Sequence, residues 1–132
     1  MPEKKRRKIL IIDDDPLVMK SFLSLLNSDG YSAVGATDIS KALKLLQRNV
    51  FDIVITELVM EEMGGNELLS ALFQKAPDIT IMILTGHGSV QIAIDAIRNG
   101  AYDYILKPCD YNVLKMRIDK AITDLNMAER KK

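Results

Sequence analysis

Short apolar runs alternate with amphipathic segments along the chain, and this alternation constrains the fold more than any other sequence feature. The runs are rich in β-branched residues, and one of them, ITIMIL at residues 79–84, is almost wholly apolar, as expected for a strand covered on both faces. Alternating strands and helices with short connections are typical of an α/β doubly wound fold, here with a five-stranded parallel sheet and five helices. We expect strands at residues 8–12, 31–36, 51–56, 79–84 and 102–106, and helices at residues 16–29, 39–46, 66–75, 89–99 and 111–128.

The length of 132 residues fits one domain that can bury a core without disulfides or metals. A single cysteine, Cys109, excludes an intramolecular disulfide and suits a reducing compartment. No apolar run approaches the roughly 18 residues that a membrane-spanning helix needs. The apolar run after the basic N-terminus is too short for a signal peptide. We therefore expect a cytoplasmic protein.

The formal net charge of zero hides an asymmetry along the chain. Residues 4–8 carry five positive charges and residues 130–132 carry three, so residues 9–129 retain ten basic and 17 acidic residues, a net charge of −7. An acidic body suits a site that attracts cations and argues against direct nucleic-acid binding by the domain. The basic arm could contact nucleic acid or a membrane, but such a run is more often a solvated terminus. We expect neither partner.

The sequence divides into a basic arm at residues 1–8, a domain at residues 9–125 and a charged tail at residues 126–132. In the last predicted helix, apolar residues recur at alternating spacings of four and three, so it could run as one helix to residue 128 or beyond. We expect packing on the sheet to explain the first part of this stripe. The tail is then a truncated linker or a short helical dimer seam.

Polar side chains stand where four of the predicted strands end. Because the carboxyl ends of parallel strands meet at one edge of a sheet, we expect these side chains to lie together. Converging carboxylates repel one another unless a cation neutralises them, and oxygen ligands with open positions suit Mg²⁺. A lysine and a hydroxyl beside them favour binding of a tetrahedral anion. The group consists of Asp13, Asp14, Glu57, Thr85 and Lys107.

Each member of this group also has a simpler explanation. The acidic run before Pro16 is often a helix N-terminal cap, a lysine before proline is a common turn, and threonine commonly ends strands. It is the coincidence of all of them at strand ends that favours a site.

Four stretches carry a resemblance to a known family: IIDDDP, DIVITELVM, ILTGHG and AYDYILKP. Over about residues 8–125 the chain resembles the receiver domain of bacterial two-component response regulators, most similar to receivers of the enhancer-binding regulator type. The resemblance implies a flavodoxin-like fold of receiver type. It also implies a phosphorelay, in which a sensor histidine kinase or a phosphotransfer protein passes phosphate to an aspartate with the help of Mg²⁺.

The resemblance assigns roles by position. Asp13 and Asp14 correspond to the acidic pair that binds the metal, and the Val59 carbonyl to its backbone ligand. Thr85 and Lys107 are implied to contact the phosphoryl group. The resemblance also implies Tyr104 as the aromatic switch and a cis peptide bond between Lys107 and Pro108. We expect His87 to be a loop residue rather than a catalyst.

The chain departs from the family pattern at the phosphoacceptor position, where Glu57 replaces aspartate. Glu61 replaces the usual proline nearby, and Gly64 stands at a commonly acidic position. One extra methylene carries the Glu57 carboxylate about 1.5 Å further into the site, and transfer geometry is sensitive to such a shift. We expect poor or no phosphorylation. Glu57 either mimics the phosphorylated state or pairs with Lys107 in an inactive-like domain.

The predicted helix at residues 89–99 has apolar residues on two sides. We predict that Val90, Ala93, Ile94 and Ile97 form its core face. On the other side Ile92 and Ala96, beside Tyr104, are either scattered surface residues or a docking surface. Such a surface, made with the strand at 102–106 and the last helix, could bind an output domain or a second copy.

Two other functional classes are weaker. A Mg²⁺-dependent phosphohydrolase with an acidic nucleophile normally needs a cap domain, for which 132 residues leave no room. A flavodoxin-like cofactor binder needs a phosphate-binding loop after the first strand, where three aspartates would repel a phosphate. We therefore expect a signalling module rather than an enzyme.

Overall fold

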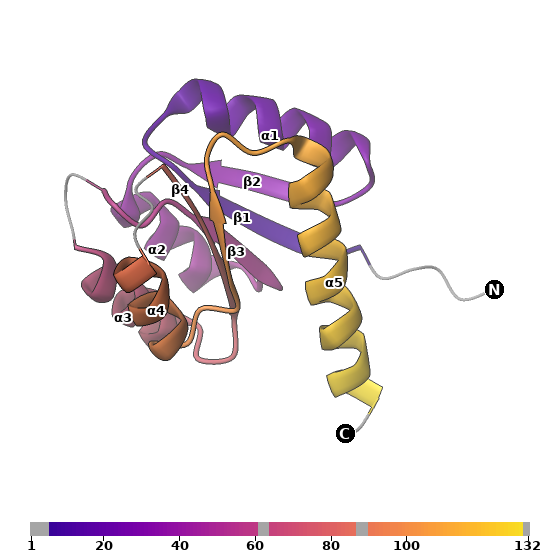
Figure 1. Ribbon diagram of the computed structural model, residues 1–132. Helices are drawn as coiled ribbons and strands as arrows, with labels where there is room; N and C mark the ends of the chain where they lie inside the picture. Colours follow the sequence, from indigo (N-terminus) through magenta and orange to yellow (C-terminus); the bar gives the residue numbers. More distant parts are fainter. Residues whose placement is uncertain (1–5, 61–63, 87–89, 131–132) are drawn as a thin grey trace.

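The computed structural model describes residues 6–60, 64–86 and 90–130, and within them five strands alternate with five helices (Figure 1). The expectations for the arm at residues 1–5, for Glu61 and for His87 lie outside these residues. The elements are β1 (Lys8–Ile12), α1 (Pro16–Ser28), β2 (Ser32–Ala36), α2 (Ile39–Arg48), β3 (Ile53–Thr56), α3 (Gly65–Lys75), β4 (Thr80–Thr85), α4 (Val90–Arg98), β5 (Asp103–Leu106) and α5 (Tyr111–Arg130).

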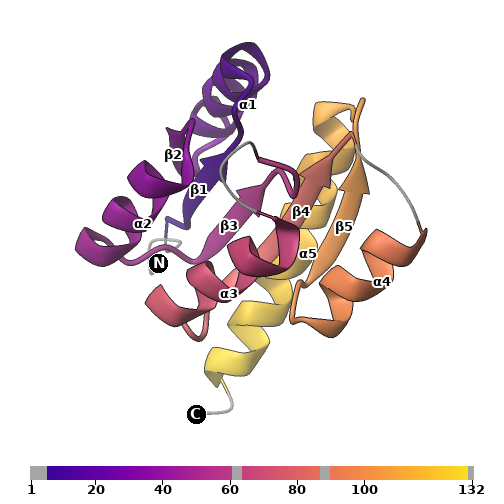
Figure 2. The same ribbon diagram turned by 90° about the vertical axis from the view of Figure 1, so that its left-hand side faces the viewer.

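The five strands form one parallel sheet in the order β2-β1-β3-β4-β5. Helices α1 and α5 cover one face and α2, α3 and α4 cover the other, which confirms the doubly wound α/β fold (Figures 1 and 2). The register pairs Ile12 with Thr56, so β1 and β3 end side by side. This pairing places the residues that follow the two strands next to each other.

The sheet divides the core into two apolar layers. Successive residues of β1 alternate between them, with Ile9 and Ile11 facing α1 and α5, and Leu10 and Ile12 facing α2 and α3. All four residues of β3 are buried, as expected for a central strand covered on both sides. Burying one such aliphatic side chain contributes about 1.5–3 kcal/mol, so these layers are what hold the strand ends in place.

The start of α1 explains part of the acidic run. Pro16 occupies the first turn, and the Asp15 carboxylate accepts hydrogen bonds from the backbone N–H of Leu17 (3.0 Å) and of Val18 (3.4 Å). Asp15 is therefore an N-terminal cap, as Asp38 is for α2. Helix α1 ends before Gly30, whose φ of 97° is easily reached only by a residue without a side chain.

We predict that Asp15→Ala lowers the free energy of unfolding by about 1 kcal/mol, because two N–H groups of the first turn lose their acceptor. Urea unfolding followed by circular dichroism measures the change. Asp78→Ala, which removes a carboxylate from an exposed connection, is the control and should stay within about 0.5 kcal/mol of the parent. Equal losses in the two variants would contradict the capping role.

Candidate functional site

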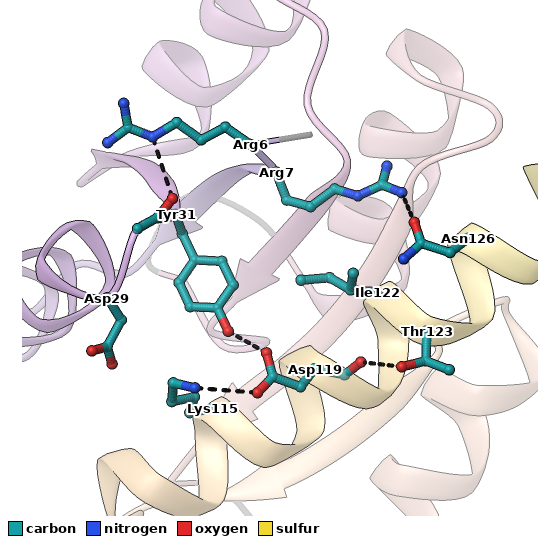
Figure 3. A pocket seen from close by; sticks show the side chains of 10 residues that line it. Arg6, Arg7, Asp29, Tyr31, Lys115, Asp119, Ile122, Thr123 and Asn126 are labelled. Atoms are coloured by element: carbon teal, nitrogen blue, oxygen red, sulfur yellow. Dashed lines mark hydrogen bonds and ion pairs between the residues drawn. The ribbon is translucent and has the colours of Figure 1, made fainter. Parts of the chain in front are cut away.

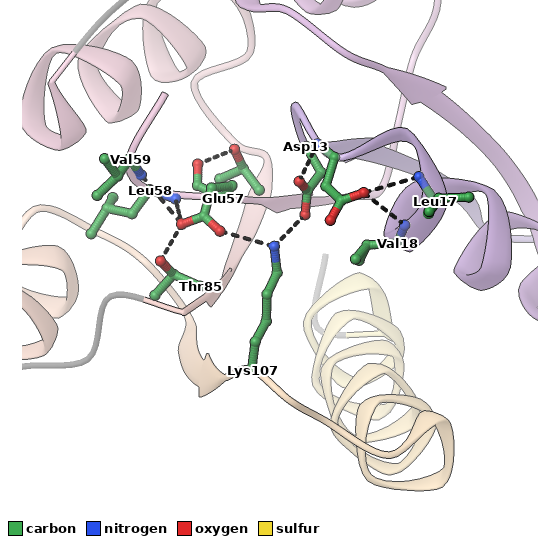
Figure 4. Close-up of polar contacts among 10 residues, drawn as sticks. Asp13, Leu17, Val18, Glu57, Leu58, Val59, Thr85 and Lys107 are labelled. Atoms are coloured by element: carbon green, nitrogen blue, oxygen red, sulfur yellow. Dashed lines mark hydrogen bonds and ion pairs between the residues drawn. The ribbon is translucent and has the colours of Figure 1, made fainter. Parts of the chain in front are cut away.

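The carboxyl ends of four strands bring the predicted residues to one edge of the sheet (Figure 4). Asp13 follows β1 and Glu57 follows β3, and the backbone N–H of Glu57 donates to the carbonyl of Ile12 at 2.9 Å. Thr85 is the last residue of β4, and its carbonyl accepts from the N–H of Lys107 at 2.9 Å. Strand pairing thus sets the positions of all four residues.

The Glu57 carboxylate lies at the centre of the site and is only 5% exposed. Its Oε1 accepts from the backbone N–H of Leu58 (3.0 Å) and of Val59 (3.3 Å), and from the hydroxyl of Thr85. Its Oε2 accepts from Lys107 Nζ at 3.0 Å. Burial raises the pKa of Glu57, but the hydrogen bonds from Thr85 and Lys107 outweigh it, so the pKa lies below its ordinary value.

Lys107 bridges two buried carboxylates. Its Nζ lies 2.6 Å from Asp13 Oδ2 and 3.0 Å from Glu57 Oε2. Burial lowers the pKa of Lys107, but the hydrogen bonds and charges of the two carboxylates raise it more, so the ammonium stays charged. The bond between Lys107 and Pro108 is cis, as the family resemblance implied.

The two candidate metal ligands of the acidic run differ in environment. Asp13 is 3% exposed and both of its oxygens have donors, the N–H of Asp15 (2.8 Å) and Lys107 Nζ, whereas Asp14 is exposed. Within the described residues, no three His, Cys, Asp or Glu side chains group closely enough to hold a metal ion. Oxygen donors suited to Mg²⁺ are present, but Lys107 supplies the cation between them. The arrangement therefore fits Mg²⁺ only in part.

Tyr104 lies on β5, three residues before Lys107. Its ring is partly buried and packs against the apolar layer on the α4 side of the sheet. Burial, and after it the negative charge of Glu57, raise the pKa of Tyr104. This is the environment that an aromatic switch would need, and the switch role itself stays a prediction.

The predicted orientation of α4 is wrong. Ala96 is 1% exposed and Ile92 packs against the core, whereas Val90, Ile94 and Ile97 are 78%, 38% and 47% exposed. Both sides of the helix are apolar, and Ala96 belongs to the buried core. Ile92 and Ala96 are therefore not an exposed docking surface. The exposed apolar side is instead the one that the helical periodicity predicts as the core face.

Sequence reasoning missed two features of the molecule. The backbone N–H groups of Leu58 and Val59 that bind Glu57 carry no sequence signal, since every residue except proline has one. Arg7, assigned to a solvated arm, is only 4% exposed. An arginine directly before an apolar strand is the one signal that could have suggested this.

The chain is similar to known proteins in both sequence and fold. Residues 9–119 match the model of the response regulator receiver domain. The chain belongs to this family. A receiver domain from Clostridium thermocellum superposes with a TM-score of 0.84 at 31% identity, covering 92% of this chain and 98% of that one. The fold and the two-component signalling role expected from the sequence are thereby confirmed.

Among curated relatives, this receiver is similar to transcriptional regulatory proteins. It is 34% identical over 119 residues to the alginate biosynthesis regulator AlgB of Pseudomonas aeruginosa, covering 90% of this chain and 26% of AlgB. It is 36% identical over 118 residues to GlrR of Escherichia coli, covering 89% and 27%. It thus resembles receivers of enhancer-binding regulators and spans about a quarter of the length of these relatives. Within the described residues, no helix has the length and apolar character to cross a membrane.

Proposed function

We propose that this receiver holds its signalling state through the Glu57 carboxylate instead of a transferred phosphoryl group. The observation that carries the proposal is that Glu57 accepts from both the Thr85 hydroxyl and the Lys107 ammonium. These are the two groups that the family resemblance assigns to the phosphoryl group. The contact to Thr85 favours a mimic of the phosphorylated state over an inactive-like pair with Lys107 alone.

In this proposal Glu57 is a poor phosphoacceptor. Each of its oxygens already accepts a hydrogen bond or an ion pair, and nucleophilic attack would have to break these contacts. Receiver domains typically bind Mg²⁺, and a structural relative from Burkholderia pseudomallei contains a phosphorylated aspartic acid and a calcium ion at 26% identity and a TM-score of 0.79. Here we expect weak Mg²⁺ binding through Asp13, Asp14 and the Val59 carbonyl, with Glu57 held by Lys107.

The proposal is tested by incubating the protein with acetyl phosphate and Mg²⁺ and measuring the intact mass. We expect no stoichiometric phosphate adduct. A stoichiometric adduct that disappears in Glu57→Gln would contradict the proposal. No observation favours the phosphohydrolase alternative, and turnover of a generic phosphate ester should be absent.

We propose partners of the classes that two-component signalling supplies: a sensor histidine kinase or phosphotransfer protein, and an output domain or a second copy. We further propose a cytoplasmic location, a receiver at residues 9–125 and a charged tail or linker at residues 126–132. The docking surface would comprise the exposed side of α4, the end of β5 and the outer side of α5. Its exposed apolar residues are Val90, Ile94, Ile97, Leu106, Val113 and Met116.

We predict that Ile97→Lys weakens self-association or output-domain binding by about tenfold or more, because it places a charge in an apolar interface. Sedimentation velocity over a concentration series measures self-association. Val50→Lys is the matched control, since Val50 is 83% exposed and lies in the connection before β3, away from this surface. Unchanged self-association in both variants would exclude this surface as the contact between two copies.

A further inference from the structure

Arg7, the residue before β1, connects the two ends of the described chain. Its Nη1 lies 3.1 Å from Asp52 Oδ1 and 3.2 Å from Glu129 Oε1. Its Nη2 donates to the side-chain oxygen of Asn126 and to Glu129 Oε2 at 3.3 Å. The guanidinium group therefore binds one carboxylate beside the sheet and two side chains on the last turns of α5. We call these four residues the Arg7 clamp.

The base of the clamp is fixed to the sheet. The Asp52 carboxylate also accepts from the backbone N–H of Lys8 at 2.9 Å, and the Asp52 N–H donates to the Lys8 carbonyl at 2.9 Å. Asp52 is the residue directly before β3, so β1 and β3 both hold it in place. Because Arg7 is only 4% exposed, its guanidinium group can reach few other partners.

The other side of the clamp is a helix end that apolar packing does not hold. The buried residues of α5 stop at Ala121, Leu125 is partly buried, and every residue at 126–130 is exposed. Figures 1 and 2 show these last turns extending beyond the sheet. Exposed helix ends without tertiary contacts fray readily, so polar contacts must supply whatever order this turn has.

The surroundings indicate a structural contact rather than a ligand site. Arg7 and Asn126 line a cavity of about 700 Å³, and Figure 3 shows them facing each other. Other lining residues also bind one another: Asp119 accepts from the Tyr31 hydroxyl and pairs with Lys115 at 3.3 Å. Arg7, Asn126 and Glu129 lie outside the segment 9–119 that matches the receiver family, and Asp52 lies within it.

We propose that Arg7 is a positioning residue that fixes the last turns of α5 to the base of β1 and β3. The clamp sets the direction in which α5 points away from the sheet. Whatever surface or segment α5 presents at this end is then held at a constant angle to the domain. This role is independent of Glu57, which lies at the opposite ends of the same two strands.

The test measures the position of the helix end separately from stability. Spin labels at Lys44→Cys and Arg130→Cys, in a Cys109→Ser background, report the distance between α2 and the end of α5. We expect a narrow distance distribution in the parent and a broad one after Arg7→Met. Arg6→Met is the matched control, because Arg6 is exposed and its Nε donates a hydrogen bond to the Gly30 carbonyl (3.3 Å), outside the clamp.

A second variant keeps the test decisive if Arg7→Met fails to fold. Glu129→Gln changes only an exposed residue of α5, and we expect it to broaden the same distribution at an unchanged melting temperature. Amide hydrogen exchange at residues 126–130 should become about tenfold faster in either clamp variant. Distributions and exchange rates equal to those of the parent in Glu129→Gln, or equally changed in Arg6→Met, would overturn the proposal.

Discussion

Glu57→Asp is expected to accept phosphate from acetyl phosphate in the presence of Mg²⁺, at a rate about 100-fold above that of the parent. The shorter side chain withdraws the carboxylate by about 1.5 Å. This shift opens space between the carboxylate and the two donors Thr85 and Lys107, where a phosphoryl group would fit. Intact-mass spectrometry over a time course measures the adduct.

Two controls make this result specific to the carboxylate and its position. Glu57→Gln keeps the length of the side chain and removes its charge, so we expect no adduct. Glu57→Asp without Mg²⁺ should also remain unmodified, because the metal neutralises the carboxylates as the phosphate approaches. An aspartate variant that stays inert with acetyl phosphate and Mg²⁺ would show that Glu57 is not what blocks acceptance.

Lys107→Met is expected to reduce the free energy of unfolding at pH 7 by about 3–5 kcal/mol, because it leaves two buried carboxylates without a cation. Asp13 and Glu57 are 3% and 5% exposed, so solvent cannot replace the ammonium. Urea unfolding measures the loss. Lys115→Met removes the exposed pair with Asp119 and should change stability by less than about 1 kcal/mol.

The same variant should reverse the pH dependence of stability. In the parent, the pKa of Glu57 is lowered on folding, so its contribution is complete above the ordinary glutamate pKa and is lost as the pH falls through the folded value. Without Lys107, we expect burial, which is the largest single influence, to outweigh the remaining hydrogen bonds from Thr85 and Val59 and to raise the pKa of Glu57. Lys107→Met should therefore become more stable as the pH falls from 7 to 5. A variant that loses stability over this range would contradict the assignment.

The sequence predicted most of the fold because each strand is a separate apolar run with its own boundaries. The start of β3 was placed too early, since Phe51 is buried without being part of the strand and Asp52 is held by Lys8. The orientation of α4 could not be predicted from periodicity, because both of its sides are apolar. What decides between them is which side packs against the core, and that side carries Ile92 and Ala96.

The candidate site was predictable because it depends on parallel strand ends, whereas the Arg7 clamp depends on partners that are distant in the sequence. Asp13, Glu57, Thr85 and Lys107 converge because β1, β3, β4 and β5 are adjacent in the sheet. Arg7 meets Asp52 and Glu129 across 45 and 122 residues of sequence, and no local pattern specifies that meeting. The sequence alone therefore predicts Arg7 to be part of the solvated arm.

The Arg7 clamp and the ion pairs of Lys107 lie at opposite ends of β1 and β3, and they differ in how strongly dissolved salt screens them. Glu129 is 46% exposed in its side chain, whereas the Asp13 and Glu57 side chains are 4% and 6% exposed. At about 1 M ionic strength the Debye length falls to roughly 3 Å, which screens exposed pairs far more than buried ones. Concentrated salt should therefore loosen the end of α5 while leaving the contacts of Lys107 with Asp13 and Glu57 intact, so that ionic strength affects one end of the sheet and not the other.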